Sequence, residues 1–329
     1  MQNNMLKIGL IFGGLSNEHE VSIISAQNIA ANFDIKKYAP VLIFWNKNGD
    51  FFRVENFKEV KIPKKQNLVK IEDFKKYFDI AFPITHGKYG EDGVLQAILE
   101  SQKIKYCGCR VLSSALCMDK AVFKQFVEGQ KIKQVKFKII IDNKLSKKEL
   151  KEIKREFILP IFVKPANSGS SVGITKVKNL KNLYSAIKIA FQHDNKVIIE
   201  QGIEKPREIE IAILGNKNLI VSEPGELKPF NEFYDYNDKY KLNKTKVTIP
   251  AKLNKKQIKE IKEIAGRVYR ICCCAGFARV DFLLKDNKIY LNEINTLPGF
   301  TQNSMYPLLM MNKGMSYKQL INRIIELAS

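Results

Sequence analysis

The sequence has few of the residues that most often build metal centres and disulfides. Its 329 residues include 3 histidines, 1 tryptophan and 6 cysteines. So few histidines make a histidine-based zinc site improbable. No two cysteines form a CxxC pair, and adjacent cysteines such as Cys272-Cys273-Cys274 rarely make good disulfides. We therefore expect buried free thiols in a reducing compartment, with a metal site formed by Cys107, Cys109 and the triplet as the alternative.

Long apolar runs are absent as well. No stretch approaches the ~18–20 consecutive apolar residues that cross a bilayer. The apolar segment Met5–Gly14 is short and rich in glycine, and no small-residue cleavage site follows it, which is unlike a signal peptide. We expect a cytoplasmic protein that does not associate with a membrane. Apolar segments recur along the whole length, which excludes a disordered chain.

Arginine is scarce although the net charge is +21. Such a charge first suggests nucleic acid. Only 8 of the 55 basic residues are arginine, the side chain that reads bases and phosphates bidentately. The lysines are scattered, as at Lys147, Lys148, Lys151 and Lys154, which favours a solvated surface. A basic nucleic-acid-binding protein remains the alternative from another functional class.

The first third of the chain alternates strand-like and helical patterns. Buried strands are expected at Leu6–Phe12, Val41–Phe44 and Asp79–Pro83. A helix is expected at Glu20–Phe33, between the first two strands. This alternation predicts an α/β fold with a parallel sheet covered by helices.

The middle third begins near Asp119. Ser146 and Glu149 have the spacing of a capping box and predict a helix that follows Ser146. Strands are expected at Ile161–Lys164 and Val197–Glu200, with a helix between them, and the segment 202–206 is a plausible hinge.

The last third contains a long polar segment from Pro224 to Pro250 without clear periodicity. Loops of this length inside a compact domain are often functional lids. Asn254 is expected to cap a helix. Strands at Phe277–Leu284 and Lys288–Asn295 are joined by a turn-forming segment, which predicts a β-hairpin.

This hairpin carries the most informative local pattern. We assume that Leu284 pairs with Lys288 beside the turn, a register in which Arg279 lies opposite Glu293. One face then presents an arginine and three oxygen ligands: Arg279, Asp281, Glu293 and Asn295. A slip of one residue would separate them. Oxygen ligands beside an arginine suit Mg²⁺ and a phosphate, and a solvent-exposed polar face is the alternative.

A loop of small residues, Ser168–Gly173, follows the strand that ends at Lys164. Small residues let backbone N–H groups approach and hold a phosphate, which Lys164 could also reach. A simple flexible turn is the alternative. Neither GxxxxGK[ST] nor GxGxxG occurs, so a P-loop and a Rossmann dinucleotide site are not supported.

Two other residues stand at strand ends. Glu20 follows Gly13-Gly14 at the start of a helix, where it either stabilises the helix dipole or binds a substrate ammonium at the sheet edge. His86 lies in a glycine-rich loop after a strand, and a lone histidine is more often structural than catalytic.

Taken in order, these segments resemble the D-alanine–D-alanine ligases of the ATP-grasp superfamily over nearly the whole chain. The matching segments are Gly13–Ser22, His86–Gly93, Met118–Lys120, Val163–Pro165, Gly169–Gly173, Phe233–Tyr240, Arg279–Asp281 and Asn292–Gly299. The resemblance implies a three-domain ATP-grasp fold with an N-terminal parallel α/β domain. The implied domains are residues 1–118, which bind substrate, the central lobe 119–206, and the C-terminal lobe 207–329 with an omega loop at about 225–250.

The resemblance also implies the reaction. ATP phosphorylates one D-alanine, a second D-alanine attacks the D-alanyl phosphate, and D-alanyl-D-alanine is formed for peptidoglycan precursors. A bacterial, cytoplasmic, homodimeric enzyme is implied, with D-alanine and ATP as its small-molecule partners. A D-alanine–D-lactate ligase and another ATP-grasp amino-acid ligase are the alternatives within the same superfamily.

Residue roles carry over from the matching motifs. The ATP-binding residues would be Lys120, Lys164, Ser168, Ser171, Glu200, Gln201, Ile203 and Glu208. Glu200, with the backbone of Gln201 and Ile203, would bind the adenine edge, and Glu208 would bind the ribose. Two Mg²⁺ ions, replaceable by Mn²⁺, would be held by Asp281, Glu293 and Asn295.

The remaining roles concern the substrates and the reaction. Glu20 would bind the first ammonium, and its link to Ser170 and Tyr240 would close the omega loop. Lys239 would contact the transferred phosphoryl group. The groups that would stabilise the oxyanion are Arg279 and the N–H of Gly299, and those that would bind the second carboxylate are Ser304 and the N–H of Met305. His86 would help to position substrate.

Overall fold

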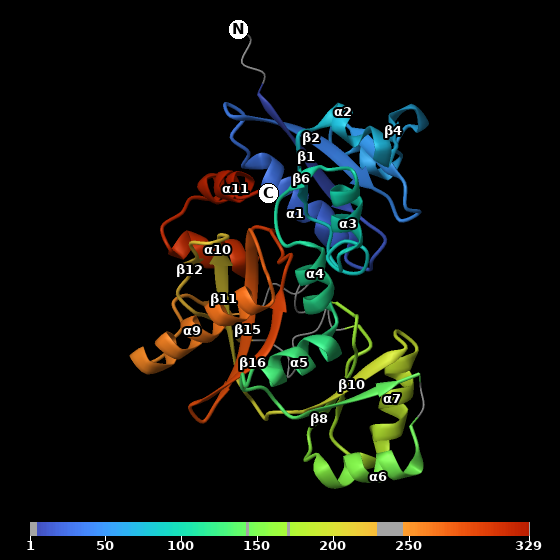
Figure 1. Ribbon diagram of the computed structural model, residues 1–329, viewed down its shortest axis with the longest axis vertical. Helices are drawn as coiled ribbons and strands as arrows, with labels where there is room; N and C mark the ends of the chain where they lie inside the picture. The colour runs from blue at the N-terminus through green and yellow to red at the C-terminus, as the bar shows by residue number, and fades with distance from the viewer. Residues whose placement is uncertain (1–4, 143–144, 170–171, 229–245, 329) are drawn as a thin grey trace.

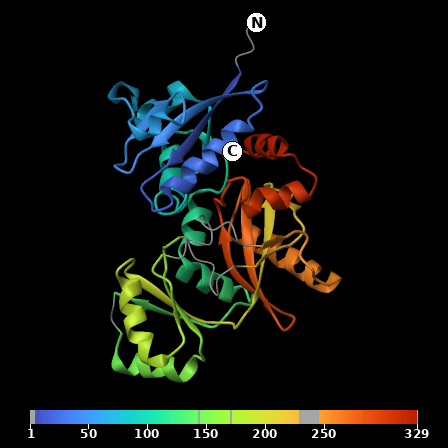
Figure 2. The same cartoon turned by 180° about the vertical axis from the view of Figure 1, so that it is seen from behind.

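The computed structural model describes residues 5–142, 145–169, 172–228 and 246–328. These residues form three sheets in succession along the chain, each accompanied by helices. Figures 1 and 2 show the N-terminal unit at one end of the molecule, the middle unit at the other, and the C-terminal unit between them. A site formed where they meet can therefore draw residues from all three.

The first unit contains a six-stranded sheet within the described residues, ordered β4-β3-β2-β1-β5-β6. The pairs β1–β2 and β1–β5 are parallel as expected, and so is β5–β6, whereas the pairs β2–β3 and β3–β4 are antiparallel. The short turn after β2 explains this difference, because it returns the chain as a hairpin rather than through a helical crossover. The strands are β1 (Leu6–Gly13), β2 (Tyr38–Trp45), β3 (Phe51–Val54), β4 (Leu68–Val69), β5 (Ile80–Pro83) and β6 (Lys105–Tyr106). The helices are α1 (His19–Ala31), α2 (Phe74–Tyr77) and α3 (Val94–Ser101), with 3₁₀ turns at Glu59–Lys61, Lys65–Asn67 and Ile71–Asp73.

The middle unit has an antiparallel sheet in the order β7-β10-β8-β9. The capping box at Ser146 and Glu149 is present and starts α6 as predicted. The strands are β7 (Phe137–Ile141), β8 (Ile161–Pro165), β9 (Thr175–Val177) and β10 (Lys196–Gln201). Helix α4 (Val111–Met118) precedes this unit at the end of the first one. The helices of the middle unit are α5 (Lys120–Gly129), α6 (Lys147–Glu156) and α7 (Leu183–Phe191), with a 3₁₀ turn at Leu180–Asn182.

The C-terminal unit has a sheet in the order β14-β13-β11-β15-β16, with β12 beside β11. Asn254 caps α9 in a second capping box, as the sequence predicts for that residue. The strands are β11 (Arg207–Leu214), β12 (Ile220–Val221), β13 (Gly225–Lys228), β14 (Lys246–Thr248), β15 (Phe277–Lys285) and β16 (Lys288–Asn295). The helices are α9 (Lys255–Ile271), α10 (Met305–Asn312) and α11 (Tyr317–Glu326).

The register of the β15–β16 hairpin differs from the assumed one. Lys288 pairs with Lys285, so the pairing at the turn is one residue away from the assumed pairing with Leu284. A slip of this size would place the polar side chains of the two strands on opposite faces. The assumed register was therefore wrong.

A β-bulge at Asn292 returns the polar side chains of the two strands to the same face. Asn292 is the extra residue between two successive pairs of the ladder, and it moves every later side chain of β16 to the other face. Glu293 therefore lies opposite Asp281, and Asn295 lies opposite Arg279. The expected set of four polar side chains does share one face, through pairings other than those assumed.

The first and last units share one hydrophobic core. Residues of β1 and α1, such as Leu10 and Ile29, belong to the same buried cluster as Ile324 of α11 and Leu309 of α10. Phe300, fully buried after β16, stacks edge-on with Phe82 of β5. The C-terminal helices thus fix the N-terminal sheet above the C-terminal sheet.

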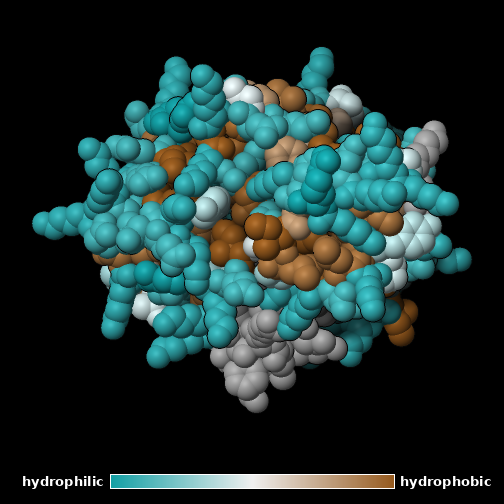
Figure 3. Space-filling view, turned by 90° about the horizontal axis from the view of Figure 1, so that it is seen from below, coloured by the Kyte–Doolittle hydropathy of each residue, from teal (hydrophilic) through white to brown (hydrophobic). Residues whose placement is uncertain are grey.

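Five of the six cysteines are buried thiols as expected, and Cys273 is exposed. The described residues contain no helix long and apolar enough to span a membrane. Figure 3 shows one face of the molecule on which long hydrophilic side chains project on all sides around smaller hydrophobic areas.

Candidate active site

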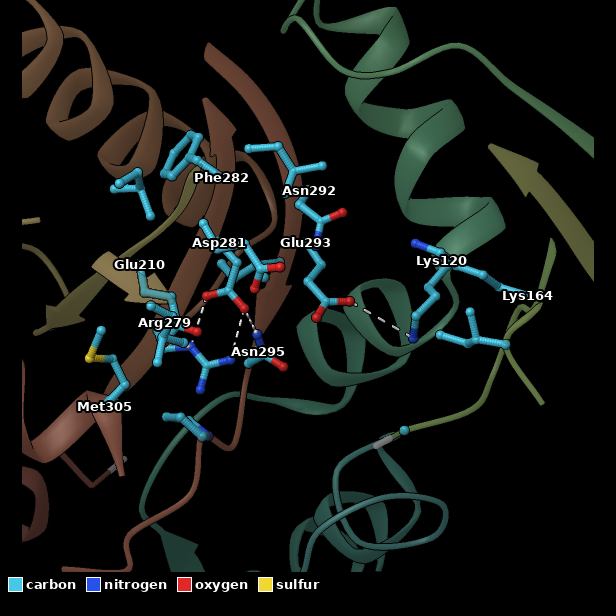
Figure 4. A pocket seen from close by; sticks show the side chains of 18 of the residues that line it. Lys120, Lys164, Glu210, Arg279, Asp281, Phe282, Asn292, Glu293, Asn295 and Met305 are labelled. Atoms are coloured by element: carbon cyan, nitrogen blue, oxygen red, sulfur yellow. Dashed lines mark hydrogen bonds and ion pairs between the residues drawn. The ribbon is translucent and has the colours of Figure 1, made fainter. Parts of the chain in front are cut away.

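A cavity of about 1530 Å³ lies where the three units meet. The N-terminal unit contributes Glu18 and His86, and the middle unit contributes Lys164. The C-terminal unit contributes Asp281 and Glu293 from the β15–β16 hairpin, as Figure 4 shows. The cavity therefore brings acidic and basic side chains together from distant parts of the sequence.

The predicted metal ligands form one corner of this cavity. Asp281 accepts two hydrogen bonds of 2.8 Å from the Arg279 guanidinium and one of 2.9 Å from the Asn295 amide. Glu293 points towards Lys120, with 4.0 Å between its Oε2 and the ammonium nitrogen (Figure 4). Carboxylate and amide oxygens at the edge of a polar cavity are the donors that Mg²⁺ prefers.

This donor set fits a magnesium ion chemically. Among the described residues, no three His, Cys, Asp or Glu side chains cluster as metal ligands, so the amide of Asn295 has to complete the set with Asp281 and Glu293. Each of the two carboxylates faces a cationic side chain at present. A cation held here would compete with Arg279 and Lys120 for the same oxygens.

Glu210 belongs to this corner, although the sequence analysis did not single it out. It lies on β11 opposite Asp281, and its Oε2 is 2.8 Å from Nε of Arg279. Burial alone would lower the pKa of Arg279, but Asp281 and Glu210 outweigh it and raise this pKa well above its usual value. The alternation of Glu208 and Glu210 along β11 is the signal that could have identified it.

Three lysines and one glutamate form a second corner. Lys120 donates to the carbonyl of Ser168 (2.8 Å), and Lys164 donates to Glu200 (2.6 Å). Lys124, not anticipated from the sequence, lies 3.3 Å from the other oxygen of Glu200. Burial would raise the pKa of Glu200, yet the two ammonium groups lower it to about 2. The two ammonium groups therefore favour the ionised form of Glu200.

Glu18, rather than the predicted Glu20, lines the cavity. Glu20 is exposed on the first turn of α1 and does not line the cavity, whereas Glu18 is buried and does. A Cβ at Gly169 would collide with the Glu18 carboxylate, so a larger residue at this position would require the Glu18 side chain to move. The two side chains differ in position because Glu18 precedes α1 as its N-cap residue, whereas Glu20 lies in the first turn of the helix.

His86 is buried beside this carboxylate. Its Nδ1 lies 3.2 Å from the carbonyl of Leu297, and its Nε2 lies 3.2 Å from the hydroxyl of Ser25. Burial lowers the pKa of His86 in spite of the Glu18 charge, which favours a neutral ring that donates to the carbonyl and accepts from the hydroxyl. The ring thereby links α1 to the loop after β16.

Glu91, in the same glycine-rich loop, also lines the cavity. Burial, reinforced by the Glu18 charge, raises the pKa of Glu91 to about 8. The sequence analysis quoted this residue only as part of a motif. Its perturbed carboxyl is a consequence of the tertiary structure, which brings it close to a second buried acid.

The far end of the cavity is formed by the start of α10. Ser304 is the residue before the helix, its hydroxyl accepts a 2.9 Å hydrogen bond from the N–H of Thr301, and no side chain caps the first turn. Gly299, Ser304 and Met305 all line the cavity, as expected. The start of a helix with uncapped N–H groups suits a carboxylate.

The expected nucleotide side is also lined by the predicted residues, namely Ser168, Glu200, Gln201, Ile203 and Glu208. The N–H of Gln201 donates to the carbonyl of Lys136 (2.8 Å), so this residue has its carbonyl to offer rather than its N–H. Ser170, Ser171, Lys239 and Tyr240 lie outside the described residues, as does most of the expected lid.

Comparisons with known proteins decide the family. The model described as "D-ala D-ala ligase N-terminus" matches residues 7–109, and that described as "D-ala D-ala ligase C-terminus" matches residues 126–326. The chain is 47% identical to the D-alanine–D-alanine ligase of Caldicellulosiruptor bescii, covering 98% of this chain and 95% of that protein. The chain belongs to the D-alanine–D-alanine ligase family.

Other relatives of this ligase agree. The D-alanine–D-alanine ligase of Clostridium acetobutylicum is 42% identical over 98% of both chains. The crystal structure of the VanG D-Ala:D-Ser ligase from Enterococcus faecalis matches with a TM-score of 0.87 and 36% identity, covering 98% of this chain and 99% of that one. The structure of the D-alanine–D-alanine ligase from Coxiella burnetii matches with a TM-score of 0.84 and 30% identity, covering 98% of this chain and 93% of that one. The ATP-grasp fold and the family expected from the sequence are confirmed.

Proposed function

We propose that this ligase joins two molecules of D-alanine to D-alanyl-D-alanine for peptidoglycan precursors. One ATP is converted to ADP and phosphate, and a D-alanyl phosphate is the intermediate. Membership of the family supports the reaction. The observation that carries the proposal is the single cavity that joins a cationic corner, an oxygen-ligand corner and an uncapped helix start.

The cationic corner is where ATP phosphates bind in this proposal. Lys120 and Lys164 act as point charges on the phosphates, and the loop from Ser168 covers them together with Ser170 and Ser171. Glu200 accepts a hydrogen bond from the adenine amino group, beside Gln201 and Ile203, and Glu208 binds the ribose. The ionised state of Glu200 supports its role as an acceptor.

Glu18 binds the ammonium of the first D-alanine in this proposal, in place of Glu20. Its burial, its position in the cavity lining and its contact with the Gly169 loop support the assignment. His86 helps to position the substrate. Arg279, held by Asp281 and Glu210, stabilises the negative oxygen of the tetrahedral intermediate together with the N–H of Gly299. Positioning and charge therefore do the work, with no covalent enzyme intermediate.

The second D-alanine binds with its carboxylate at the start of α10, where Ser304 and the N–H of Met305 meet it. Asp281, Glu293 and Asn295 would hold two Mg²⁺ ions, or Mn²⁺. Such ions neutralise the charge that builds up on the transferred phosphoryl group. Lys239 and Tyr240 complete the site from the lid, which excludes water from the acyl phosphate.

Several broader assignments belong to the same proposal. The domains are residues 1–118, 119–206 and 207–329, and the lid lies within about 225–250. The ligase acts as a homodimer in the bacterial cytoplasm. Its partners are D-alanine and ATP.

The reaction is tested by phosphate release from Mg-ATP with D-alanine, L-alanine, and D-alanine mixed with D-lactate or D-serine. Product masses are recorded at several pH values. Release that requires D-alanine, with the mass of D-alanyl-D-alanine, is expected. If the mixed products dominate at neutral pH, the acceptor is not D-alanine and the proposed substrate is wrong.

The two glutamates at the start of α1 give a matched pair of variants. Glu18→Gln is expected to raise the KM of the first D-alanine and to lower kcat/KM about 100-fold or more, because a buried charge partner is lost. Glu20→Gln keeps near-normal kinetics because its side chain is exposed. The reverse result would return the ammonium site to Glu20.

A further inference from the structure

We propose that Lys124 is a positioning residue for the nucleotide, which keeps Glu200 paired and ionised when Lys164 turns to the phosphates. Glu200 can then distinguish an adenine amino group from a keto group. This inference rests on the proposed role of Glu200 at the adenine edge. It concerns a lysine that does not itself line the cavity.

The two lysines divide the Glu200 carboxylate between them. Lys124 takes Oε1 at 3.3 Å, and Lys164 takes Oε2 at 2.6 Å. One carboxylate thus has two ammonium partners, one more than its charge requires. A second buried cation has to be explained, because burying an ammonium costs several kcal/mol before its attraction to a partner is counted.

The two partners are not equivalent in their freedom to move. The Lys124 side chain is 2% exposed and lies behind the carboxylate, whereas that of Lys164 is 14% exposed and faces the cavity. Lys124 is also held by its backbone, because α5 begins at a capped turn and its carbonyl accepts a 2.7 Å hydrogen bond from Gln134. Lys164 is therefore the ammonium that can exchange Glu200 for a phosphate, and Lys124 is the one that stays.

If Lys124 were missing, the Glu200 carboxylate would have no ammonium partner once Lys164 had moved to a phosphate. A buried carboxylate without a counter-charge takes up a proton, since burial favours the neutral form. A protonated carboxyl can donate to a keto oxygen as readily as it accepts from an amino group. The discrimination between a 6-amino and a 6-oxo purine would then be lost, although every group that touches the nucleotide is still present.

The experiment compares the Kd of ATP with that of inosine triphosphate, measured by calorimetry for the Mg-nucleotides. The variants are Lys124→Met, Glu200→Gln, the double variant, and Lys154→Met on exposed α6 as the control. The ratio of the Kd of inosine triphosphate to the Kd of ATP is expected to fall about tenfold in Lys124→Met. This change corresponds to the loss of one charged hydrogen bond between Glu200 and the adenine amino group. The control keeps the wild-type ratio, and the double variant is no worse than Glu200→Gln.

A pH series separates this role from a merely structural one. In Lys124→Met the preference for ATP is expected to fall as the pH is lowered from about 8 to about 5, the interval in which a buried carboxyl without a counter-charge takes up a proton. The wild-type preference is expected to stay constant over the same interval. If Lys124→Met does not fold, Lys124→Gln, which keeps a polar donor without the charge, is expected to give the same loss. If a folded Lys124 variant keeps the wild-type ratio while Glu200→Gln loses the preference for ATP, the role of Lys124 is wrong but the adenine role of Glu200 stands. An unchanged ratio in Glu200→Gln overturns the proposed adenine role itself.

Discussion

The chemistry of this ligase depends on residues whose charge is set by a neighbour rather than by their own type. Glu200 and Glu91 both line one cavity, yet the pKa of Glu200 is lowered to about 2 and that of Glu91 is raised to about 8. The difference comes from two ammonium groups beside Glu200 and from the Glu18 carboxylate near Glu91. Such contrasts separate groups that hold a charge from groups that hold a proton.

Glu293→Gln tests the metal corner at the residue scale. The variant keeps the size of the side chain but removes the charge that would hold a cation, so Mg²⁺-dependent turnover is expected to fall about 100-fold or more. The measurement is phosphate release at saturating Mg²⁺, with circular dichroism to verify the fold. Glu263→Gln, on the exposed face of α9, serves as the control, and near-normal turnover of Glu293→Gln would remove this residue from the metal site.

Glu91 predicts a pH dependence of stability in the ligand-free protein. Between about pH 4.5 and 8, Glu91 is protonated when folded and ionised when unfolded, so unfolding releases a proton. The free energy of unfolding therefore falls as the pH rises, by up to about 1.4 kcal/mol per unit from this group. Urea titrations should show a flatter profile for Glu91→Gln than for the wild type and Glu263→Gln. Identical slopes in all three proteins would contradict the raised pKa.

At the scale of elements, the β15–β16 hairpin shows how far an alternation pattern can be trusted. Ile289 and Leu291 face the core at a spacing of two, but the next core residue of β16 is Ile294, at a spacing of three. The change of spacing results from the bulge at Asn292, and the sequence alone already contains it. The set of polar residues on the shared face could be predicted, but the pairing could not.

The capping boxes make a second prediction at this scale. Asn254 accepts a hydrogen bond from Gln257 N–H (2.9 Å), starts α9 and does not line the cavity. Asn254→Ala is expected to lower the free energy of unfolding by about 1 kcal/mol and to leave kcat unchanged. Asn254→Asp, which keeps a cap, should remain near wild type in the same denaturation series. A loss of activity without a loss of stability would be inconsistent with a purely structural cap.

On the scale of the whole molecule, the shared core of the first and last units holds the cavity together. Ile324 of α11 is fully buried in the cluster that also contains the N-terminal strand β1. This arrangement fixes Glu18 and His86 opposite the β15–β16 hairpin, although at least 190 residues lie between them and the hairpin in sequence. The active site therefore depends on packing that lies well outside it.

Ile324→Ala tests this dependence. Truncating a fully buried side chain typically costs about 2–5 kcal/mol, and here the loss should loosen the first unit against the last. Chemical denaturation measures the loss, and the KM for D-alanine should rise because the two halves of the site lose their fixed spacing. Ile158→Ala, at an exposed position, is expected to change the free energy of unfolding by less than about 0.5 kcal/mol.

The sequence by itself determined several of the strands and helices, two helix caps, the family and the set of polar residues on one hairpin face. These are local properties, because alternation, capping spacing and motif order depend on residues close together in the chain. Only the tertiary structure decided that Glu18 rather than Glu20 enters the cavity and that Glu210 holds Arg279. It also decided that Lys124 lies behind Glu200 and that the hairpin is bulged. Burial and charge pairing arise between segments far apart in sequence, and no local pattern records which of two neighbouring glutamates will meet a loop from another unit.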